Sequence, residues 1–469
     1  MIARENPARP SETVGSVEEC ADVGSRVEAA QQAQLTWRDL APVDRTTVLL
    51  SALEPVDGQL DELAVLLARE SGKPLPDSRG ELGFALTFAR WAAGRAPEVL
   101  QDREIDDAQG RLVERRVPYG VVGAVTPWNA PVILALLKVA PALLAGNAIV
   151  VKPSPLAPLA VSGLLEQLAG GLPDGLLDVV HGGPDVGAAL IAHPAVRKVA
   201  FTGGDVTGRA IAQLAAERLV PAVLELGGND PAVFLEDAEL TDEAMDRLVM
   251  ASFATAGQVC MAAKRLYVHE TRYADFLESY LAAAGRVLVT GDPLQAGVTM
   301  GPVVTRAAAD RVTALLRDGT AHRLGTTREL GAGYFVEPVL VTDLADDAPL
   351  VAQEQFGPAV PLLTFRGDDE VVSRANAGEL GLGASVWSAD EDRAFALGRR
   401  LEAGFVFVNT HNRTGMSLRA PFGGVKGSGY GREYGDEGLR DYTQTCVTHA
   451  PAAFRTGGGG STAAAYPTA

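Results

Sequence analysis

Between residues 121 and 226, short apolar runs alternate with longer stretches in which apolar residues recur at helical spacing. The runs occupy residues 121–125, 148–151, 177–180, 199–201 and 222–226, and the helical stretches include residues 132–144 and 159–168. Apolar strands that alternate with helices are typical of a parallel sheet covered by helices on both faces. The sequence therefore predicts an α/β fold built on such a sheet.

A second alternating series follows and predicts another α/β unit. Helical spacing marks residues 242–255 and 272–287, and strand-like runs lie at residues 265–269, 360–365, 384–386 and 405–409. The first hundred residues predict helices over 17–36 and 44–70, the second ended by Gly72 and Pro74. Residues 103–116 predict a two-stranded ribbon with a turn at 107–110.

Composition limits the functions open to this chain. Its 469 residues, 47% hydrophobic and 21% charged, are enough for two or three domains with large cores. A net charge of -18, with no lysine- or arginine-rich run, argues against binding to nucleic acid or to anionic membrane surfaces. The N-terminus lacks the apolar core of a signal peptide, so we expect a cytoplasmic protein.

Neither a membrane span, a disulfide scaffold nor a metal site is predicted. The apolar stretch 130–151 contains Lys138 and Pro141, so a buried helix followed by a core strand accounts for it better than a span does. Cys20, Cys260 and Cys446 cannot all pair, which indicates a reducing compartment. The six histidines are scattered without metal-ligand spacing.

Three residues together indicate acyl chemistry: Cys260, Glu225 and Asn129. A thiolate can add to a carbonyl carbon, a side-chain amide can hold the resulting oxyanion, and a carboxylate can activate water. A lone cysteine is more often a small buried hydrophobe, and the other two residues favour a nucleophile instead. Glu225 ends an apolar strand, where a carboxylate faces the crevice at the carboxyl edge of a sheet. No histidine neighbours the cysteine, so backbone dipoles are the expected source of thiol activation.

Seven motifs occur in an order that resembles the aldehyde dehydrogenase superfamily. They are Thr126-Pro127-Trp128-Asn129, Lys152-Pro153-Ser154, Phe201-Thr202-Gly203, Glu225-Leu226-Gly227-Gly228, Gly257-Gln258-Val259-Cys260, Glu354-Gln355-Phe356-Gly357-Pro358 and Pro421-Phe422-Gly423-Gly424. The resemblance covers nearly the whole chain. It implies an NAD(P)-dependent enzyme of the hydrolytic branch, which oxidises an aldehyde to the acid through a cysteine thioester.

The resemblance also implies an aldehyde dehydrogenase-like organisation. A Rossmann-type NAD(P)-binding domain would comprise residues 1–102 and 119–226, an α/β catalytic domain residues 227–438, and a β oligomerisation arm residues 103–118 and 439–455. The arm implies a homodimer or homotetramer, and a small-molecule aldehyde is the other expected partner. The glycine-rich end, residues 456–469, is predicted to be a disordered tail.

Four residues receive catalytic roles from the resemblance. Cys260 would be the nucleophile, Glu225 the general base, and Asn129 with the Cys260 N–H the oxyanion hole. Lys138 would join a proton relay with a residue near the C-terminus, whose expected position is Gln444, although a structural amine is the alternative. Branches that transfer the acyl group to coenzyme A generally lack the base, so Glu225 favours release of the free acid. The alternatives are a coenzyme A-acylating enzyme and a catalytically idle scaffold of the same fold.

The resemblance implies a cofactor site without a Gly-x-Gly-x-x-Gly motif. Lys152 would contact the adenosine ribose, Glu354 would bind the nicotinamide ribose, and Phe356 would lie beside the ring. Pro155 stands where many NAD-preferring members carry a glutamate that repels a 2′-phosphate, so NAD is expected and NADP is possible. The full predicted set is Thr126, Pro127, Trp128, Lys152, Ser154, Pro155, Gly183, Gly187, Phe201, Thr202, Gly203, Gly204, Leu226, Gly227, Glu354 and Phe356.

Candidates for the substrate pocket include Phe84, Phe88 and Trp91, which share one helix face, although aromatic residues at this spacing are usual in a core. Arg413 and Arg419 could bind a substrate carboxylate, and solvated surface is the alternative for both. Lysines are few: the chain has six, against 41 - 6 = 35 arginines. Those in or beside motifs are therefore candidates for specific point-charge contacts.

Overall fold

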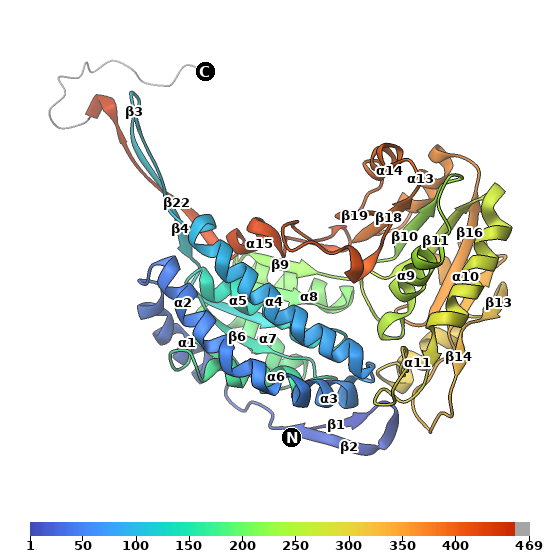
Figure 1. Cartoon of the computed structure of the whole chain (residues 1–469). Coiled ribbons are helices and arrows are strands. Elements are labelled where there is room, and N and C mark those ends of the chain that lie inside the picture. The colour runs from blue at the N-terminus through green and yellow to red at the C-terminus, as the bar shows by residue number, and fades with distance from the viewer. Residues whose placement is uncertain (455–469) are drawn as a thin grey trace.

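A computed structural model describes residues 1–454 of the chain (Figure 1). The predicted tail, residues 456–469, lies outside the described residues. Two large sheets organise the molecule, one of six strands and one of seven, and a long ribbon projects from the body. No helix within residues 1–454 is both long and apolar enough to cross a membrane.

In the six-stranded sheet the order is β21-β9-β8-β5-β6-β7, and all neighbours are parallel except β21. Its strands are β5 (Val121–Val125), β6 (Ala148–Lys152), β7 (Leu177–Val179), β8 (Val196–Thr202), β9 (Ala222–Glu225) and β21 (Gly429–Tyr430). The intervening helices are α5 (Pro131–Leu144), α6 (Leu159–Ala169), α7 (Pro184–Ala192) and α8 (Asp205–Glu217). The predicted parallel sheet is confirmed, and the stretch 130–151 forms a buried helix and a core strand.

The carboxyl ends of four strands meet at one edge of this sheet. Val125 is level with Lys152 on one side and with Phe201 on the other, and Thr202 is level with Glu225. The strand order reverses beside β5, because β6 and β7 lie on one side of it and β8 and β9 on the other. Ligands of doubly wound sheets bind at such a switch point. The loops that follow these strands carry most of the predicted site residues.

The seven-stranded sheet has the order β13-β15-β16-β11-β10-β18-β19. Its strands are β10 (Asp230–Phe234), β11 (Ala263–His269), β13 (Thr320–Arg323), β15 (Val339–Thr342), β16 (Ala359–Phe365), β18 (Gly383–Trp387) and β19 (Phe405–Val408). Along β10, Ala232 and Phe234 belong to one core and Val233 to another, so both faces are covered. Helices α9 (Asp242–Phe253) and α10 (Tyr273–Val287) supply the first core, and α13 (Asp368–Asn376) and α14 (Glu391–Gly398) supply the second.

The predicted ribbon is confirmed as three antiparallel strands that project from the body in Figure 1. They are β3 (Arg103–Asp107), β4 (Gly110–Pro118) and β22 (Thr443–Pro451). Strand β22 pairs along the whole of β4, and Val447 on it is 56% exposed. The ribbon therefore extends beyond the hydrophobic cores of the two sheets.

The N-terminal segment differs from its prediction. The helix predicted from residue 17 begins only at α1 (Val23–Trp37), because Asp22 caps it by accepting from Ser25 N at 3.1 Å. The helix predicted over 44–70 is divided into α2 (Pro42–Leu53) and α3 (Leu60–Ser71) by a 3-10 segment that contains Pro55 and Gly58. Both errors come from treating helical spacing as continuous across local breaks.

A hairpin that the sequence does not predict precedes α1. Its strands are β1 (Ile2–Asn6) and β2 (Arg9–Val17), which lie along the lower side of the molecule in Figure 1. The buried Arg4 guanidinium donates to the carbonyl of Glu70, at 2.7 Å, and to that of Val304, at 3.2 Å. These acceptors are far along the chain, so local spacing could not reveal what holds the hairpin in place.

Candidate active site

The backbone before Cys260 forms a left-handed turn. Thr255, Ala256 and Gly257 have φ values of +56°, +54° and +70°, a region that costs a residue with a side chain about 1–2 kcal/mol. A Cβ at Gly257 would lie 2.3 Å from the carbonyl oxygen of Gly357, so this position requires glycine. Strain of this kind is found at functional sites, where it fixes the direction of a reactive side chain.

Gln258 connects this turn to the predicted oxyanion residue. Its Nε2 donates to the Thr255 carbonyl at 3.0 Å, and its Oε1 accepts from Val304 N at 2.9 Å. Its backbone carbonyl accepts from Asn129 Nδ2 at 3.0 Å. Because an amide nitrogen has two protons, Asn129 keeps one donor for an oxyanion formed beside Cys260.

Glu225 ends β9 and is 4% exposed. Its Oε1 has no hydrogen-bond partner among the described residues, and a Cβ at Gly423 would lie 2.8 Å from that atom. Burial raises the pKa of Glu225 well above the usual carboxyl range, the nearby Glu433 carboxylate raises it further, and Lys138 opposes both. A carboxyl group with a raised pKa and a free oxygen is suited to exchange protons with water.

The partner of Lys138 is Glu433, and the prediction of Gln444 is wrong. The Lys138 ammonium donates to Glu433 Oε1 at 2.6 Å and to Thr202 Oγ1 at 2.7 Å, all within the buried interior. Gln444 instead pairs with Val117 in the ribbon. A carboxylate, unlike a glutamine amide, can accept and return a proton, as a relay requires.

The bend between β21 and α15 (Gly435–Arg440) explains this error. Tyr434 in that bend has a φ of +56°, and Glu433 directly before it is 3% exposed. The bend turns the Glu433 side chain into the interior beside β8 and β9. Spacing along the sequence does not reveal such a bend. The available signal was that Glu433 follows shortly after the Pro421-Phe422-Gly423-Gly424 motif.

Among the charged side chains near the Cys260 thiol, Lys264 has the largest effect on the thiol pKa. Burial raises the pKa of Cys260 to about 12, and the Lys264 ammonium is the main influence that opposes this rise. The sequence predicts backbone dipoles as the source of thiol activation, and the structure adds a buried lysine four residues after the thiol. The sequence signal for this role of Lys264 was that it is one of the few lysines and lies beside the Cys260 motif.

Glu354 and Phe356, the predicted contacts of the nicotinamide ribose and ring, pack against the loops that hold Gly228 and Trp128. Glu354 Oε1 accepts from Gly228 N at 3.1 Å and from the Lys264 ammonium. A Cβ at Gly227 would lie 2.3 Å from Glu354 Oε2, so the absence of a side chain at Gly227 allows the carboxylate to approach the backbone closely. The Phe356 ring packs edge-on against Trp128 with centroids 5.6 Å apart. The loops after β5 and β9 and the segment before β16 are thereby brought together.

Two buried polar groups near the end of β6 lack good partners. Lys152 is 5% exposed, burial lowers its pKa, and its ammonium makes a long hydrogen bond of 3.4 Å to the Pro153 carbonyl. The buried Thr126 hydroxyl has no partner among the described residues. Gly187 lies against the Lys152 stem, where a Cβ would be 3.4 Å away. Both polar groups are available to a ligand at the switch point.

Glycines begin the two helices beside this point. Gly183 is the N-cap of α7 and Gly204 the N-cap of α8, and these helices contact each other. A Cβ at Gly204 would meet no atom within 4 Å, so space remains there. The other predicted cofactor residues, Pro127, Ser154, Pro155, Phe201, Thr202, Gly203 and Leu226, lie in the loops or strand ends of the same edge.

Aromatic side chains gather next to the reactive groups. Phe88 on α4 (Leu75–Val99) is 1% exposed and packs edge-on against Tyr434 at 5.3 Å, and Phe84 lies 6.4 Å from the same ring. Phe422 contacts Tyr434 from the other side at 6.3 Å. Burial, and then the charges of Glu433, Cys260 and Glu225, raise the pKa of Tyr434. Tyr434, which the sequence does not single out, therefore lies among these rings within the influence of the Glu433, Cys260 and Glu225 charges.

The aromatic helix face divides between two roles. Phe88 is a core residue, as the alternative interpretation holds, whereas Phe84 and Trp91 are half-buried at the edge of that core. Arg413 pairs with Asp77 at 3.0 Å, so its charge is already compensated, and Arg419 is exposed. Neither arginine is a ready carboxylate receptor.

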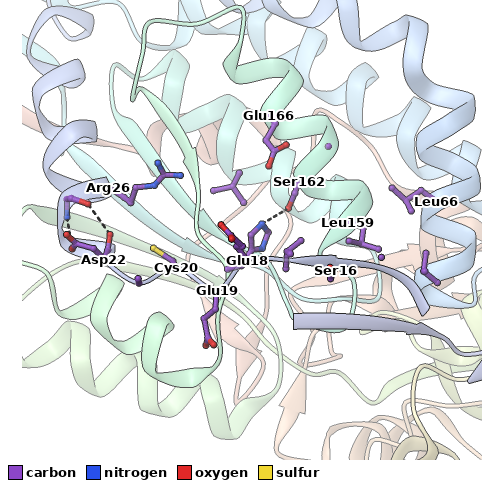
Figure 2. A pocket seen from close by; sticks show the side chains of 18 residues that line it. Ser16, Glu18, Glu19, Cys20, Asp22, Arg26, Leu66, Leu159, Ser162 and Glu166 are labelled. Atoms are coloured by element: carbon purple, nitrogen blue, oxygen red, sulfur yellow. Dashed lines mark hydrogen bonds between the residues drawn. The ribbon is translucent and has the colours of Figure 1, made fainter. Parts of the chain in front are cut away.

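A cavity of about 780 Å³ lies elsewhere, between β2, the start of α1 and α6 (Figure 2). Ser162 and His181 meet across it at 3.4 Å, and Cys20 and Glu166 also line it. None of the four predicted catalytic residues lines this cavity. A smaller cavity of about 340 Å³ is lined by Gly227 and Glu354 with Arg209 and Arg311. The predicted catalytic residues therefore lie outside the larger of these two cavities.

Comparisons with known proteins identify the family of this chain. The aldehyde dehydrogenase family profile matches residues 1–447. A phenylacetaldehyde dehydrogenase of Pseudomonas fluorescens is 39% identical, with 90% of this chain and 87% of that protein covered. An NADP(+) succinate-semialdehyde dehydrogenase of Escherichia coli is 35% identical, with 94% and 92% covered. The crystal structure of an NAD-dependent aldehyde dehydrogenase from Sinorhizobium meliloti superposes with a TM-score of 0.90 at 33% identity, with 96% of this chain and 91% of that one covered. The chain belongs to the aldehyde dehydrogenase family.

Proposed function

We propose that this enzyme oxidises an aldehyde to the free carboxylic acid, with NAD or NADP as the hydride acceptor, through a thioester on Cys260. The observation that carries the proposal is that the Asn129 amide donates to the carbonyl of Gln258, two residues before Cys260, while the buried Glu225 lies close enough for its charge to act on the Cys260 thiol. Asn129 follows β5, Glu225 ends β9, and Cys260 follows α9. The names of the relatives, which include NAD- and NADP-dependent aldehyde dehydrogenases, support the same reaction class.

Each group has a defined task in the proposed reaction. The Cys260 thiolate adds to the aldehyde carbon, and the Asn129 amide with the Cys260 N–H holds the oxyanion. A bound nicotinamide cofactor supplies the acceptor for the hydride that this carbon loses. Glu225 then takes a proton from the water that attacks the thioester, and the sulfur leaves as a thiolate with release of the acid. Glu433 and Lys138, hydrogen-bonded to each other, are placed to pass the proton onward.

The residues at the switch point fit a dinucleotide. The Thr126 hydroxyl and Lys152 ammonium are buried polar groups in need of partners, and the space beside Gly204 lies at a helix N-terminus, which favours phosphate. Pro155 offers no carboxylate to repel a 2′-phosphate, so we propose that both NAD and NADP bind. Residues 1–102 and 119–226 would form the cofactor domain and residues 227–438 the catalytic domain.

A substrate panel tests this function against its two alternatives. Aliphatic, aromatic and carboxylated aldehydes are each assayed with NAD and with NADP, in the presence and absence of coenzyme A. We expect NAD(P)H and the free acid to form in equal amounts without coenzyme A. A strict requirement for coenzyme A would identify an acylating enzyme, and no NAD(P)H with any aldehyde would indicate an idle scaffold.

We also propose that the ribbon pairs two copies of this chain. Its strands β3, β4 and β22 extend from the body, and a three-stranded sheet without a covered face is marginally stable alone. The seven-stranded sheet ends in the open edge strand β19, beside a groove of about 300 Å³ lined by Phe395, Val406 and Val408. An edge strand with an adjoining apolar groove is suited to accept a strand from a second copy.

Light scattering during size-exclusion chromatography tests this assembly. Phe395 is 52% exposed in the groove, so Phe395→Glu should convert a dimer or tetramer to smaller species at micromolar concentration. Val43→Glu is the matched control, because Val43 is 55% exposed on α2, outside the ribbon and the groove. A monomeric wild-type protein, or equal dissociation of both variants, would contradict the proposed interface.

A further inference from the structure

Lys264 is a buried cation that connects the nucleophile loop with the predicted ribose-binding carboxylate. It lies on β11, four residues after Cys260, and its side chain is 2% exposed. Its ammonium donates to the Gly228 carbonyl at 2.6 Å, to the Cys260 carbonyl at 2.7 Å and to Glu354 Oε1. All three protons of the ammonium are thereby used.

The geometry of these contacts requires a lysine. The acceptors come from three separate segments and converge on a single nitrogen, which also lies 5.4 Å from the centre of the Phe356 ring. A planar guanidinium with five donors could not serve three acceptors around one atom. In a chain with 35 arginines, a lysine at this position is therefore explained by its contacts.

We propose that Lys264 is a positioning residue, which holds Glu354 for the cofactor and stabilises the thiolate form of Cys260 by its charge. Its protons are fully engaged, so it acts on the sulfur without a hydrogen bond to it. Glu354 Oε2 receives no hydrogen bond from any described residue and points toward Gly227, which lines the 340 Å³ cavity together with Glu354. Lys264 thus fixes one oxygen of the carboxylate and leaves the other for a ribose hydroxyl.

The charges around the thiol support this role. Burial raises the pKa of Cys260 to about 12, Lys264 opposes that rise, and the carboxylates of Glu354, Asp230 and Glu225 add to it. Lys264 is therefore the main counter-charge for a thiolate in an acidic surrounding. The inference rests on the proposed role of Cys260 as nucleophile, but its test does not need turnover.

The test measures alkylation of Cys260 by iodoacetamide as a function of pH, resolved by peptide mass spectrometry, without cofactor or aldehyde. We expect Lys264→Met to raise the apparent pKa of Cys260 and to lower its alkylation rate at neutral pH about tenfold, the factor that one pKa unit gives. Glu354→Gln should change the rate in the opposite direction, since it removes a negative charge. The half-buried Cys20 and Cys446 serve as internal references in the same samples.

Lys198→Met is the matched control. Lys198 is also 2% exposed, pairs with Asp441 at 2.9 Å, and lies 5.6 Å from the Tyr119 ring, but it does not contact the Cys260 loop. The Lys198→Met variant should leave the pH dependence of Cys260 alkylation unchanged, even if the substitution lowers the free energy of unfolding. Identical Cys260 profiles for wild type, Lys264→Met and Glu354→Gln would overturn the inference. If Lys264→Met fails to fold, Lys264→Gln takes its place in the same assay, with the same expected result. Absence of an acyl group on Cys260 in Glu225→Gln, stopped while it forms NAD(P)H from an aldehyde, would instead refute the proposed function.

Discussion

Replacing Cys260 with alanine should abolish aldehyde oxidation, with kcat reduced by at least about 10⁴-fold, because no other thiol lies near Asn129 and Glu225 within the described residues. Cofactor binding should persist, since the side chains predicted to hold it, including Lys152 and Glu354, are unchanged. The measurement combines steady-state NAD(P)H formation with a separate titration of cofactor binding by quenching of tryptophan fluorescence.

The matched control is Cys446→Ala. Cys446 is likewise a free, half-buried cysteine, but it lies on β22 in the projecting ribbon. This variant should retain activity close to that of wild type. If Cys260→Ala kept more than about a tenth of wild-type turnover, covalent catalysis at this thiol would be excluded.

Replacing Glu225 with glutamine should separate the two halves of the reaction. Glutamine cannot accept a proton from water, so hydrolysis of the thioester should slow by about 10²-fold or more, the usual contribution of a general base. Formation of the thioester does not need this base. Rapid mixing should therefore give a burst of NAD(P)H close to one equivalent per active site, followed by a slow steady state.

The pH dependence of the slow step gives a second check. Because the pKa of Glu225 is raised, a larger share of it is protonated at neutral pH than for an ordinary carboxyl group. Hydrolysis by wild type should therefore increase with pH above the usual carboxyl range, because Glu225 loses its proton at a higher pH than an ordinary carboxyl group does. The residual hydrolysis by Glu225→Gln should lack this increase. Equal steady-state rates and pH profiles for both proteins would refute the assignment of the base.

Much of the fold follows from periodicity, because buried parallel strands are nearly all apolar and the helices between them carry one apolar stripe. The strands at 121–125 and 360–365 are found within one residue of their predicted bounds. The hairpin β1–β2 is different, since Arg4 holds it through carbonyls of residues 70 and 304. Contacts of that range leave no local pattern in the sequence.

The candidate site shows the same division. Cys260, Glu225 and Asn129 are predicted by residue type and motif, and the structure brings their loops together at the ends of parallel strands. Glu433 and Tyr434 depend on a bend with a left-handed residue, which spacing does not predict. Lys264 depends on three acceptors from different loops. Motifs predict the reactive groups, whereas the partners of these groups are set by tertiary structure.

The most direct test of the account is mass spectrometry of Glu225→Gln stopped by acid during the burst with an aldehyde and NAD(P). The account predicts an added acyl group, the aldehyde mass less two hydrogens, on the single peptide that contains Cys260. An acyl group on Cys20 or Cys446, or an unmodified protein while NAD(P)H accumulates, would contradict it.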